Sequence, residues 1–197
     1  RPARQAWLRR MQTTARDRPG LIAAPASLAG IRHMMKALRR GEAVGLLPDQ
    51  VPPEGMGVWA PYFGREAYTM TLAARLVQQT GATPLLMGGE RRAAGKGFAV
   101  RVRELPEPLP EPNYAAPAKL RATVGASNTG EAYSPAPDPA TKEAADVGHH
   151  VACATVINRA MELLVREQPQ QYLWGYHRYK QPRRSEAPAP VSPAPAA

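Results

Sequence analysis

The 197-residue chain contains a single cysteine, Cys153, and no long apolar run. One thiol excludes an intrachain disulfide framework and a zinc site built on cysteine pairs, so Cys153 is expected to be a small buried side chain. No stretch of about 18 apolar residues is present, so the sequence predicts no bilayer-spanning helix. No signal peptide is visible. Because the chain starts at Arg1 rather than at methionine, we expect a fragment or a processed product.

Acidic residues are scarce at the start of the chain. Residues 1–40 contain ten Lys and Arg but a single acid, Asp17, and so carry nine of the chain's ten net positive charges. Such a concentrated positive field suits nucleic acid, an anionic lipid surface or an acidic partner protein. The alternative is a solvated basic helix face without a partner.

Hydrophobic spacing predicts several regular elements. Helical periodicity is found over residues 3–16, 28–40, 65–80 and 151–167. Short apolar or alternating runs predict strands over 21–24, 43–47, 84–87 and 98–103. We expect Ser27 and Thr69 to be N-caps, and Gly41 and Gly81 to end helices. This order predicts an α/β sheet with helices on its faces.

Composition divides the chain into four parts. We predict a central α/β region over 1–104 and a helical and aromatic–basic segment of the same domain over 149–184. Between them, residues 105–148 are rich in Pro and Ala and show no hydrophobic period, so we expect a flexible insertion. Residues 185–197 are nearly all Ala, Pro and Ser, and they are predicted to be a disordered tail.

The stretch 41–64 is the first candidate site. The apolar run 43–47 stops at Pro48, and Asp49 follows in a loop rich in Pro and Gly. A buried strand that ends in an acid-bearing loop is the arrangement by which an open α/β sheet builds a site. The alternative is an Asx turn that closes a plain loop.

Three ordered segments carry a family resemblance. They are Lys36–Glu42 leading into Leu47-Pro48-Asp49-Gln50, Val58–Gly64 with the following Ala67, Thr69, Thr71 and Ala73–Leu76, and Pro169–Trp174 with His177–Lys180. With these segments the chain resembles the lipid A biosynthesis acyltransferases of the late, lauroyl/myristoyl type. The resemblance covers residues 1–104 and 151–184.

This resemblance implies an α/β fold, an αβα sandwich of the lysophospholipid/glycerolipid acyltransferase type that is incomplete at the N-terminus. It implies transfer of a fatty acyl chain from an acyl carrier protein thioester to a hydroxyl of a phosphorylated glycolipid acceptor, a lipid A precursor. It places the enzyme on the inner-membrane surface, at the cytoplasmic face, with an anchor upstream of residue 1. No cofactor and no metal are implied.

The chain departs from the family at the catalytic dyad, a His followed five places later by Asp or Glu. The four histidines, His33, His149, His150 and His177, are followed at that distance by Leu38, Ala154, Thr155 and Pro182. In the family the His takes the proton from the attacking hydroxyl and the acid orients its ring. We therefore expect a C-terminal portion without its general base, inactive alone.

The resemblance nevertheless assigns binding roles to residues that are present. The substrate-binding candidates are Asp49, Gln50, one of Arg16 and Arg18, and, more weakly, His177 and Arg178. The candidates for the acyl groove or a membrane face are Trp59, Tyr62 and Phe63, with core packing as the alternative. The candidates for contact with the carrier or the membrane are Arg4, Arg9 and Arg10.

Two other functions compete with this one. A non-catalytic module would bind nucleic acid or an anionic membrane through residues 1–40 and stack bases on Tyr172–Lys180. The aromatics lie outside the basic segment and no nucleic-acid motif is present, so no nucleic-acid partner is expected. A glycerolipid acyltransferase is the other alternative, but the Pro48-Asp49-Gln50 loop favours the lipid A branch.

Overall fold

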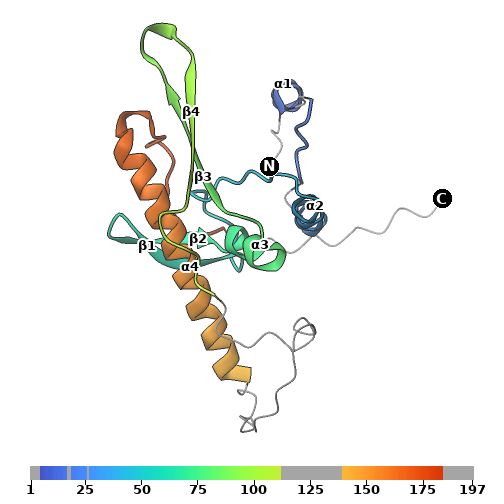
Figure 1. The fold of residues 1–197 in the computed structure, drawn as a ribbon, viewed down its shortest axis with the longest axis vertical. Coiled ribbons are helices and arrows are strands. Elements are labelled where there is room, and N and C mark those ends of the chain that lie inside the picture. Colours follow the sequence, from blue (N-terminus) through green and yellow to red (C-terminus); the bar gives the residue numbers. More distant parts are fainter. Residues whose placement is uncertain (1–4, 17–18, 26, 112–138, 184–197) are drawn as a thin grey trace, which may run out of the picture. The chain divides into compact units, whose positions relative to one another are not determined.

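The computed structural model describes residues 5–16, 19–25, 27–111 and 139–183. Its α-helices are α1 (Ala6–Arg16), α2 (Leu28–Arg39), α3 (Leu72–Thr80) and α4 (Pro139–Glu167) (Figure 1). Its strands are β1 (Gly57–Tyr62), β2 (Arg65–Met70), β3 (Leu85–Arg91) and β4 (Phe98–Glu104). Short 3-10 turns are η1 (Ala93–Gly95) and η3 (Pro169–Gln171).

The chain divides into two compact units. Unit 1 comprises Arg1–Leu46 and Leu76–Ala82, and unit 2 comprises Leu47–Arg75 and Thr83–Ala197. In unit 1, the Ser27 hydroxyl accepts a hydrogen bond from the Gly30 N–H at 3.4 Å and caps α2. Gly41 follows the helix with a φ of 80°, a left-handed conformation that glycine adopts without a steric penalty. Both predicted caps of this helix are confirmed.

Unit 2 is built around the hairpin of β1 and β2. The strands pair antiparallel, with Ala60 opposite Ala67 and Tyr62 opposite Arg65. The connecting loop is Phe63-Gly64, with φ values of 46° and 72°. Two successive positive φ values suit the right-handed twist of a tight hairpin, but Phe63 adopts this conformation at a steric cost.

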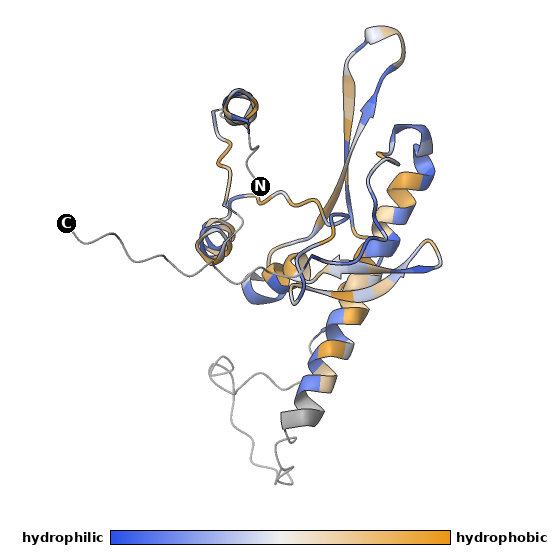
Figure 2. Cartoon of the chain, turned by 180° about the vertical axis from the view of Figure 1, so that it is seen from behind, coloured by the Kyte–Doolittle hydropathy of each residue, from blue (hydrophilic) through white to orange (hydrophobic). Residues whose placement is uncertain are grey.

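Helix α4 packs on this hairpin, mainly on β1. Ala60, Ala67 and Ala160 are fully buried, and their small side chains favour a close approach of helix and strands. Cys153 is also buried and forms a core cluster with Ala74 and Ile157, as predicted for this thiol. Figure 2 shows apolar and polar residues alternating along α4, which matches a helix with one covered side.

The second hairpin, β3 and β4, pairs antiparallel with Met87 opposite Val102 and Arg91 opposite Phe98. It lies beside the C-terminal half of α4 in Figures 1 and 2. A Cβ atom added at Gly88 would lie 3.3 Å from the Leu164 side chain, so strand and helix approach closely there. Arg103 of β4 and Glu167 of α4 form an ion pair, so both strands contact this helix.

Two predicted strands do not form. Residues 43–47 have no regular structure, and Leu47 is exposed rather than buried. Leu21 forms only an isolated bridge, and residues 22–24 are irregular and exposed. A strand is stabilised by a partner strand, and an apolar run alone does not supply one.

Two predicted helices have different bounds. The predicted helix 65–80 is β2 followed by α3, so Thr69 is a buried strand residue and not an N-cap. Gly81 ends α3 with a φ of 70°, as predicted. Helix α4 begins at Pro139, well before the predicted start at 151, so its first turns occupy part of the expected insertion. Residues 112–138 and the tail predicted over 185–197 lie outside the described residues.

The fold is a mixture of helices and small antiparallel sheets, in agreement with the predicted α/β content. The specific αβα sandwich stays a prediction. None of the described helices is both long enough and apolar enough to cross a bilayer.

Candidate functional site

Asp49 lies in an irregular loop that unit 2 holds by its backbone. The Val51 N–H donates to the Tyr176 hydroxyl at 2.8 Å. The N–H groups of Gly55 and Gly57 both donate to the Tyr68 hydroxyl, at 3.0 and 3.2 Å. Because these donors have partners, the loop is fixed without regular secondary structure.

A chain of hydroxyl groups leads from the core to Asp49. The Tyr172 hydroxyl donates to Asp49 Oδ2 at 3.3 Å, and the Tyr62 hydroxyl donates to the Tyr172 oxygen at 3.4 Å. Burial raises the pKa of both phenols above the ordinary value, so both stay protonated and able to donate. The Asp49 carboxylate therefore has a defined orientation, with its remaining lone pairs able to accept from a ligand.

Arg178 occupies the centre of a buried polar network, with only 3% of its surface exposed. It donates to the Tyr68 carbonyl at 2.8 Å, to Thr69 Oγ1 at 2.7 Å and to Asn158 Oδ1 at 3.3 Å. Asn158 in turn donates to the Pro61 carbonyl at 2.9 Å. The network thus joins β1, β2, α4 and the C-terminal segment.

No carboxylate forms an ion pair with Arg178 within the described chain. Its guanidinium carbon lies 5.1 Å from the centroid of the Tyr62 ring, a cation–π contact. Burial lowers the pKa of Arg178 from its ordinary value. Its Nε is buried and has no hydrogen-bond partner among the described residues. The arginine is held by dipoles and a ring face, which suits a structural anchor beside the Asp49 loop.

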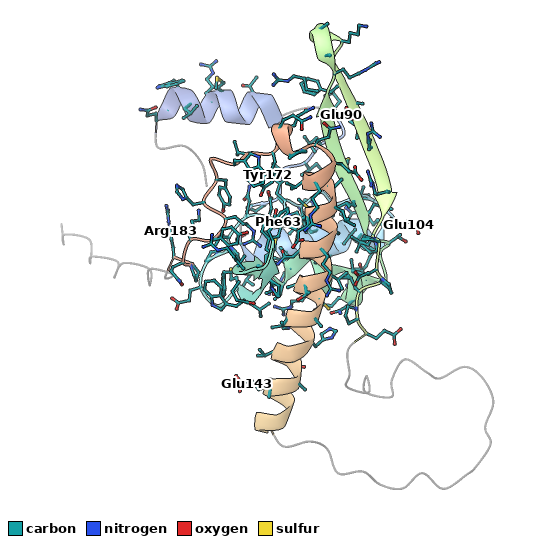
Figure 3. All side chains as sticks on the ribbon, turned by 90° about the vertical axis from the view of Figure 1, so that its left-hand side faces the viewer. Phe63, Glu90, Glu104, Glu143, Tyr172 and Arg183 are labelled. Atoms are coloured by element: carbon teal, nitrogen blue, oxygen red, sulfur yellow. The ribbon has the colours of Figure 1, made fainter. Side chains whose placement is uncertain are left out.

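The tyrosines of residues 172–180 face the protein. The Tyr179 hydroxyl donates to the Tyr62 carbonyl at 2.9 Å, and the Arg65 guanidinium lies 4.3 Å from the Tyr179 ring. Tyr172 and Tyr176 bond to the Asp49 loop, so these tyrosines fasten the segment to the rest of unit 2. Figure 3 shows Tyr172 and Phe63 beside α4. Trp174 and Leu173 remain largely exposed.

The three aromatic candidates for the groove or membrane face have different surroundings. Tyr62 is buried, Phe63 is half-buried and Trp59 is partly exposed against the Tyr68 ring. The Phe63 N–H donates to Glu162 Oε1 at 2.7 Å, which supports its unusual backbone conformation. Tyr62 thus packs in the core, while the binding role of Phe63 and Trp59 stays a prediction.

The remaining candidates are exposed, lie in unit 1 or lie outside the described residues. Gln50 and His177 are exposed in unit 2, and Arg10 is exposed on α1 in unit 1. Arg9 and Arg16 also belong to α1, whereas Arg4 and Arg18 lie outside the described residues. Among the residues that the structure describes, no group of three or more His, Cys, Asp or Glu is placed to hold a metal ion.

Sequence reasoning did not assign Thr69 or Asn158 to the site, although they complete the network under it. Asn158 lies in the middle of a helical apolar pattern, and its partners are Pro61 and Thr69, about ninety positions earlier. The one signal was a polar residue on a predicted buried helix face, because such a residue needs a partner.

The comparison with family models now adds the reaction class. Residues 1–106 match a family described as bacterial lipid A biosynthesis acyltransferase. The matched region contains Asp49 and the strands β1 and β2. The chain belongs to the bacterial lipid A biosynthesis acyltransferase family. A search of curated proteins finds none that matches the chain.

Proposed function

We propose that the chain provides the acceptor side of an O-acyltransferase, which moves a fatty acyl chain from acyl carrier protein to a hydroxyl of a phosphorylated lipid A precursor. The observation that carries this proposal is the Asp49 carboxylate, oriented by Tyr172 within a loop whose backbone is hydrogen-bonded. Family membership supplies the acyl-transfer chemistry.

In this reaction the acceptor hydroxyl oxygen attacks the thioester carbonyl carbon. A C–O bond forms, the C–S bond breaks, and the carrier's thiol leaves. A general base must take the hydroxyl proton. No His in this chain is followed at the fifth position by an acid, so we infer that the chain alone binds acceptor without transferring an acyl group.

Asp49 and Arg178 have different parts in this proposal. Asp49 accepts hydrogen bonds from sugar hydroxyls, for which its half-buried position in the loop is suited. Arg178 is too deeply buried to contact a sugar and instead holds the backbone of β2 and the ring of Tyr62 in place. Gln50 follows Asp49 in the chain, and His177 precedes Arg178. Both side chains are exposed, and they add peripheral contacts to the glycolipid.

The donor and the location belong to the same proposal. An acidic carrier protein suits the basic segment of residues 1–40, with Arg4, Arg9 and Arg10 as contacts. A phosphorylated glycolipid acceptor resides in a membrane, so the enzyme works at the inner-membrane surface on its cytoplasmic face.

Binding of a fluorescent phosphorylated glycolipid to the purified chain tests the role of Asp49. We expect Asp49→Asn to weaken binding about tenfold, because a hydrogen bond to a charged acceptor contributes about 1.5–3 kcal/mol. Tyr172→Phe should weaken it less, since the carboxylate remains but loses its orientation. Asp146→Asn on α4 is the matched control, and the thermal midpoint of each variant reports on folding.

Two results would contradict this proposal. The first is no measurable glycolipid binding by the wild-type chain, or equal binding by the wild type and Asp49→Asn. The second is acyl transfer by the purified chain. If mass spectrometry detected an acylated product after incubation with acyl carrier protein thioester and acceptor, the chain would contain a general base.

A further inference from the structure

The β3–β4 hairpin has one covered face and one uncovered face. On the covered face, Leu86 is buried and Gly88 approaches Leu164 of α4. Arg103 on this face pairs with Glu167, and Arg101 pairs with Glu90. The polar groups of this face are therefore neutralised within unit 2.

The uncovered face carries a continuous apolar strip. The antiparallel register places Met87 beside Val102, Gly89 beside Val100 and Arg91 beside Phe98. The large apolar side chains of this face are between 57% and 70% exposed; they are Leu85, Met87, Phe98, Val100 and Val102. Isolated exposed apolar residues are common, but a whole strand face of them indicates a surface that another phase or partner covers.

The tip of the hairpin is basic. Arg91, Arg92 and Lys96 lie there, and within the described chain none of them forms an ion pair. An open pocket of about 530 Å³ is lined by both arginines, by the 93–95 turn and by Gln170 and Gln171. The Gln171 side chain holds the turn by accepting from the Arg91 N–H at 2.7 Å and donating to the Arg91 carbonyl at 3.2 Å.

The turn at the tip is closed by its own backbone. The sign of φ alternates over Gly95, Lys96 and Gly97, with values of 70°, −73° and 82°. The Lys96 N–H donates to the Ala93 carbonyl at 3.3 Å, and the Arg92 N–H donates to the Gly97 carbonyl at 2.9 Å. The positive charge of the tip therefore comes from its side chains. No acidic residue lines the tip pocket.

The hairpin changes from basic at its tip to apolar along its strands and acidic at its base. The basic tip is followed by the apolar strip, and Glu104 lies at the base of β4 (Figure 3). The strip from Phe98 to Glu104 is about 20 Å long at the usual rise per strand residue. In all three views, which share a vertical axis, the tip extends beyond the C-terminal end of α4, so α4 leaves it uncovered.

We propose that the β3–β4 hairpin docks on an anionic lipid surface, with Phe98 and Val100 entering the interface and the tip pocket taking a phosphate-bearing headgroup. Apolar side chains beside Lys and Arg are the combination that binds such surfaces. The proposal rests on the hairpin alone and does not require acyl transfer or Asp49.

A second copy of the chain is the main competing occupant. Two copies packed on this strip would bring two basic tips together, since Arg91, Arg92 and Lys96 form no ion pair within the described chain. That repulsion disfavours self-association, whereas an anionic surface is attracted by the same charge. The charge of the tip therefore favours lipid.

Vesicle sedimentation of the full 197-residue chain tests the proposal. We expect binding to vesicles of phosphatidylcholine with about one third phosphatidylglycerol, and little binding to phosphatidylcholine alone. The Phe98→Ser/Val100→Ser and Arg91→Gln/Arg92→Gln variants should each bind at least about fivefold more weakly, because one loses apolar insertion and the other loses charge.

Matched controls separate the hairpin from general effects. Val147→Ser changes an exposed valine on α4, and Arg159→Gln/Arg166→Gln removes two exposed charges from the same helix. Both should bind as the wild type does. In addition, the indole of Phe98→Trp should shift to shorter wavelength on anionic vesicles and be quenched by brominated acyl chains.

Several outcomes would overturn the proposal. They are no vesicle binding by the wild type, equal binding by the hairpin variants, or loss of binding only when Arg9 and Arg10 are changed. Dimers in sedimentation equilibrium that the Phe98→Ser/Val100→Ser variant abolishes, without any vesicle binding, would assign the strip to a second copy. Because this assay measures lipid binding alone, its failure is distinguishable from failure of the acyl-acceptor proposal.

Discussion

At the scale of single residues, Arg178 determines how β2 and α4 meet beside the site. Its fork of donors serves Tyr68, Thr69 and Asn158 at the same time. Arg178→Met keeps the apolar stem but removes a charged donor from three buried acceptors, so we expect a loss of about 3 kcal/mol in the free energy of unfolding. Arg178→Lys retains the charge without the planar fork and should lose nearly as much.

Urea denaturation of these variants beside Arg159→Met provides the measurement. Arg159 forms an exposed ion pair with Glu107, and such pairs contribute at most about 1 kcal/mol. If Arg178 instead contacted the glycolipid, Arg178→Lys would weaken glycolipid binding while the unfolding free energy stayed near that of the wild type. That result would restore the direct binding role predicted from the sequence.

The sequence predicted Asp49 as a candidate but not the residues that orient it. The loop Pro48-Asp49-Gln50 is a local pattern, whereas Tyr172 reaches Asp49 from more than a hundred positions away. The aromatic run around Tyr172 was interpreted as a possible ligand grip. The structure shows its hydroxyls hydrogen-bonded to other parts of unit 2, Tyr176 as an acceptor and Tyr179 as a donor, because a half-buried phenol oxygen needs a partner.

At the scale of elements, the β1–β2 hairpin depends on a glycine at its start. A Cβ atom at Gly57 would lie 2.5 Å from the Thr69 carbonyl oxygen, 2.8 Å from Pro52 Cγ and 3.0 Å from Tyr68 Cε1. Gly57→Ala must therefore separate the strands or displace Tyr68, and we expect a loss of about 1–3 kcal/mol in unfolding free energy. Glycolipid binding should weaken too, since Tyr68 holds the Asp49 loop.

Gly89→Ala in β3 is the matched control. A Cβ atom there would meet nothing within 4 Å, so this variant should be as stable as the wild type or slightly more stable. Chemical denaturation and glycolipid titration of both variants check the prediction. Equal stability for Gly57→Ala and the wild type would mean that the loop is not held by this strand contact.

The predicted element boundaries were wrong where the pattern of buried residues has neither the strand period of two nor the helix period of 3.6. In β2, the successive residues Ala67, Tyr68 and Thr69 are all buried, so the strand lacks the alternation that identifies one. The sequence did not predict the first turns of α4 for the opposite reason, because these turns are mostly exposed. Residues 143–145 and 147–148 are exposed, and a solvent-facing helix leaves no hydrophobic pattern even though its alanines favour helix.

At the scale of the whole molecule, the family match and the site do not have the same extent. The match ends at residue 106, but Asn158, Tyr172 and Arg178 complete the surroundings of Asp49. The Asp49 loop of the matched region is thus fastened by the part of the chain that follows it. A truncation before α4 would remove the partners of Tyr62 and Thr69 together with most of the core around Cys153.

The stability of the whole chain should also depend on pH through His150. Its Nδ1 is buried and has no hydrogen-bond partner among the described residues. Burial lowers the pKa of His150, the nearby Arg75 and His149 lower it further, and Asp146 opposes them. In the unfolded chain the imidazole has a pKa of about 6.5, so the unfolded state binds a proton that the folded state excludes. Stability is therefore lost as the pH falls below this value.

We expect His150→Leu to lose less stability than the wild type between about pH 7.5 and pH 5, because this variant cannot take up that proton when it unfolds. Urea midpoints over this range give the comparison, and His33→Leu on exposed α2 is the control. The carboxylates Glu42 and Glu167 have pKa values lowered by hydrogen bonds from Arg40 and Arg103, so their contributions are lost only below about pH 4.3. These two carboxylates therefore do not contribute to a change in stability between about pH 7.5 and pH 5. Parallel pH curves for the wild type and His150→Leu would show that His150 is protonated equally in the folded and unfolded chain.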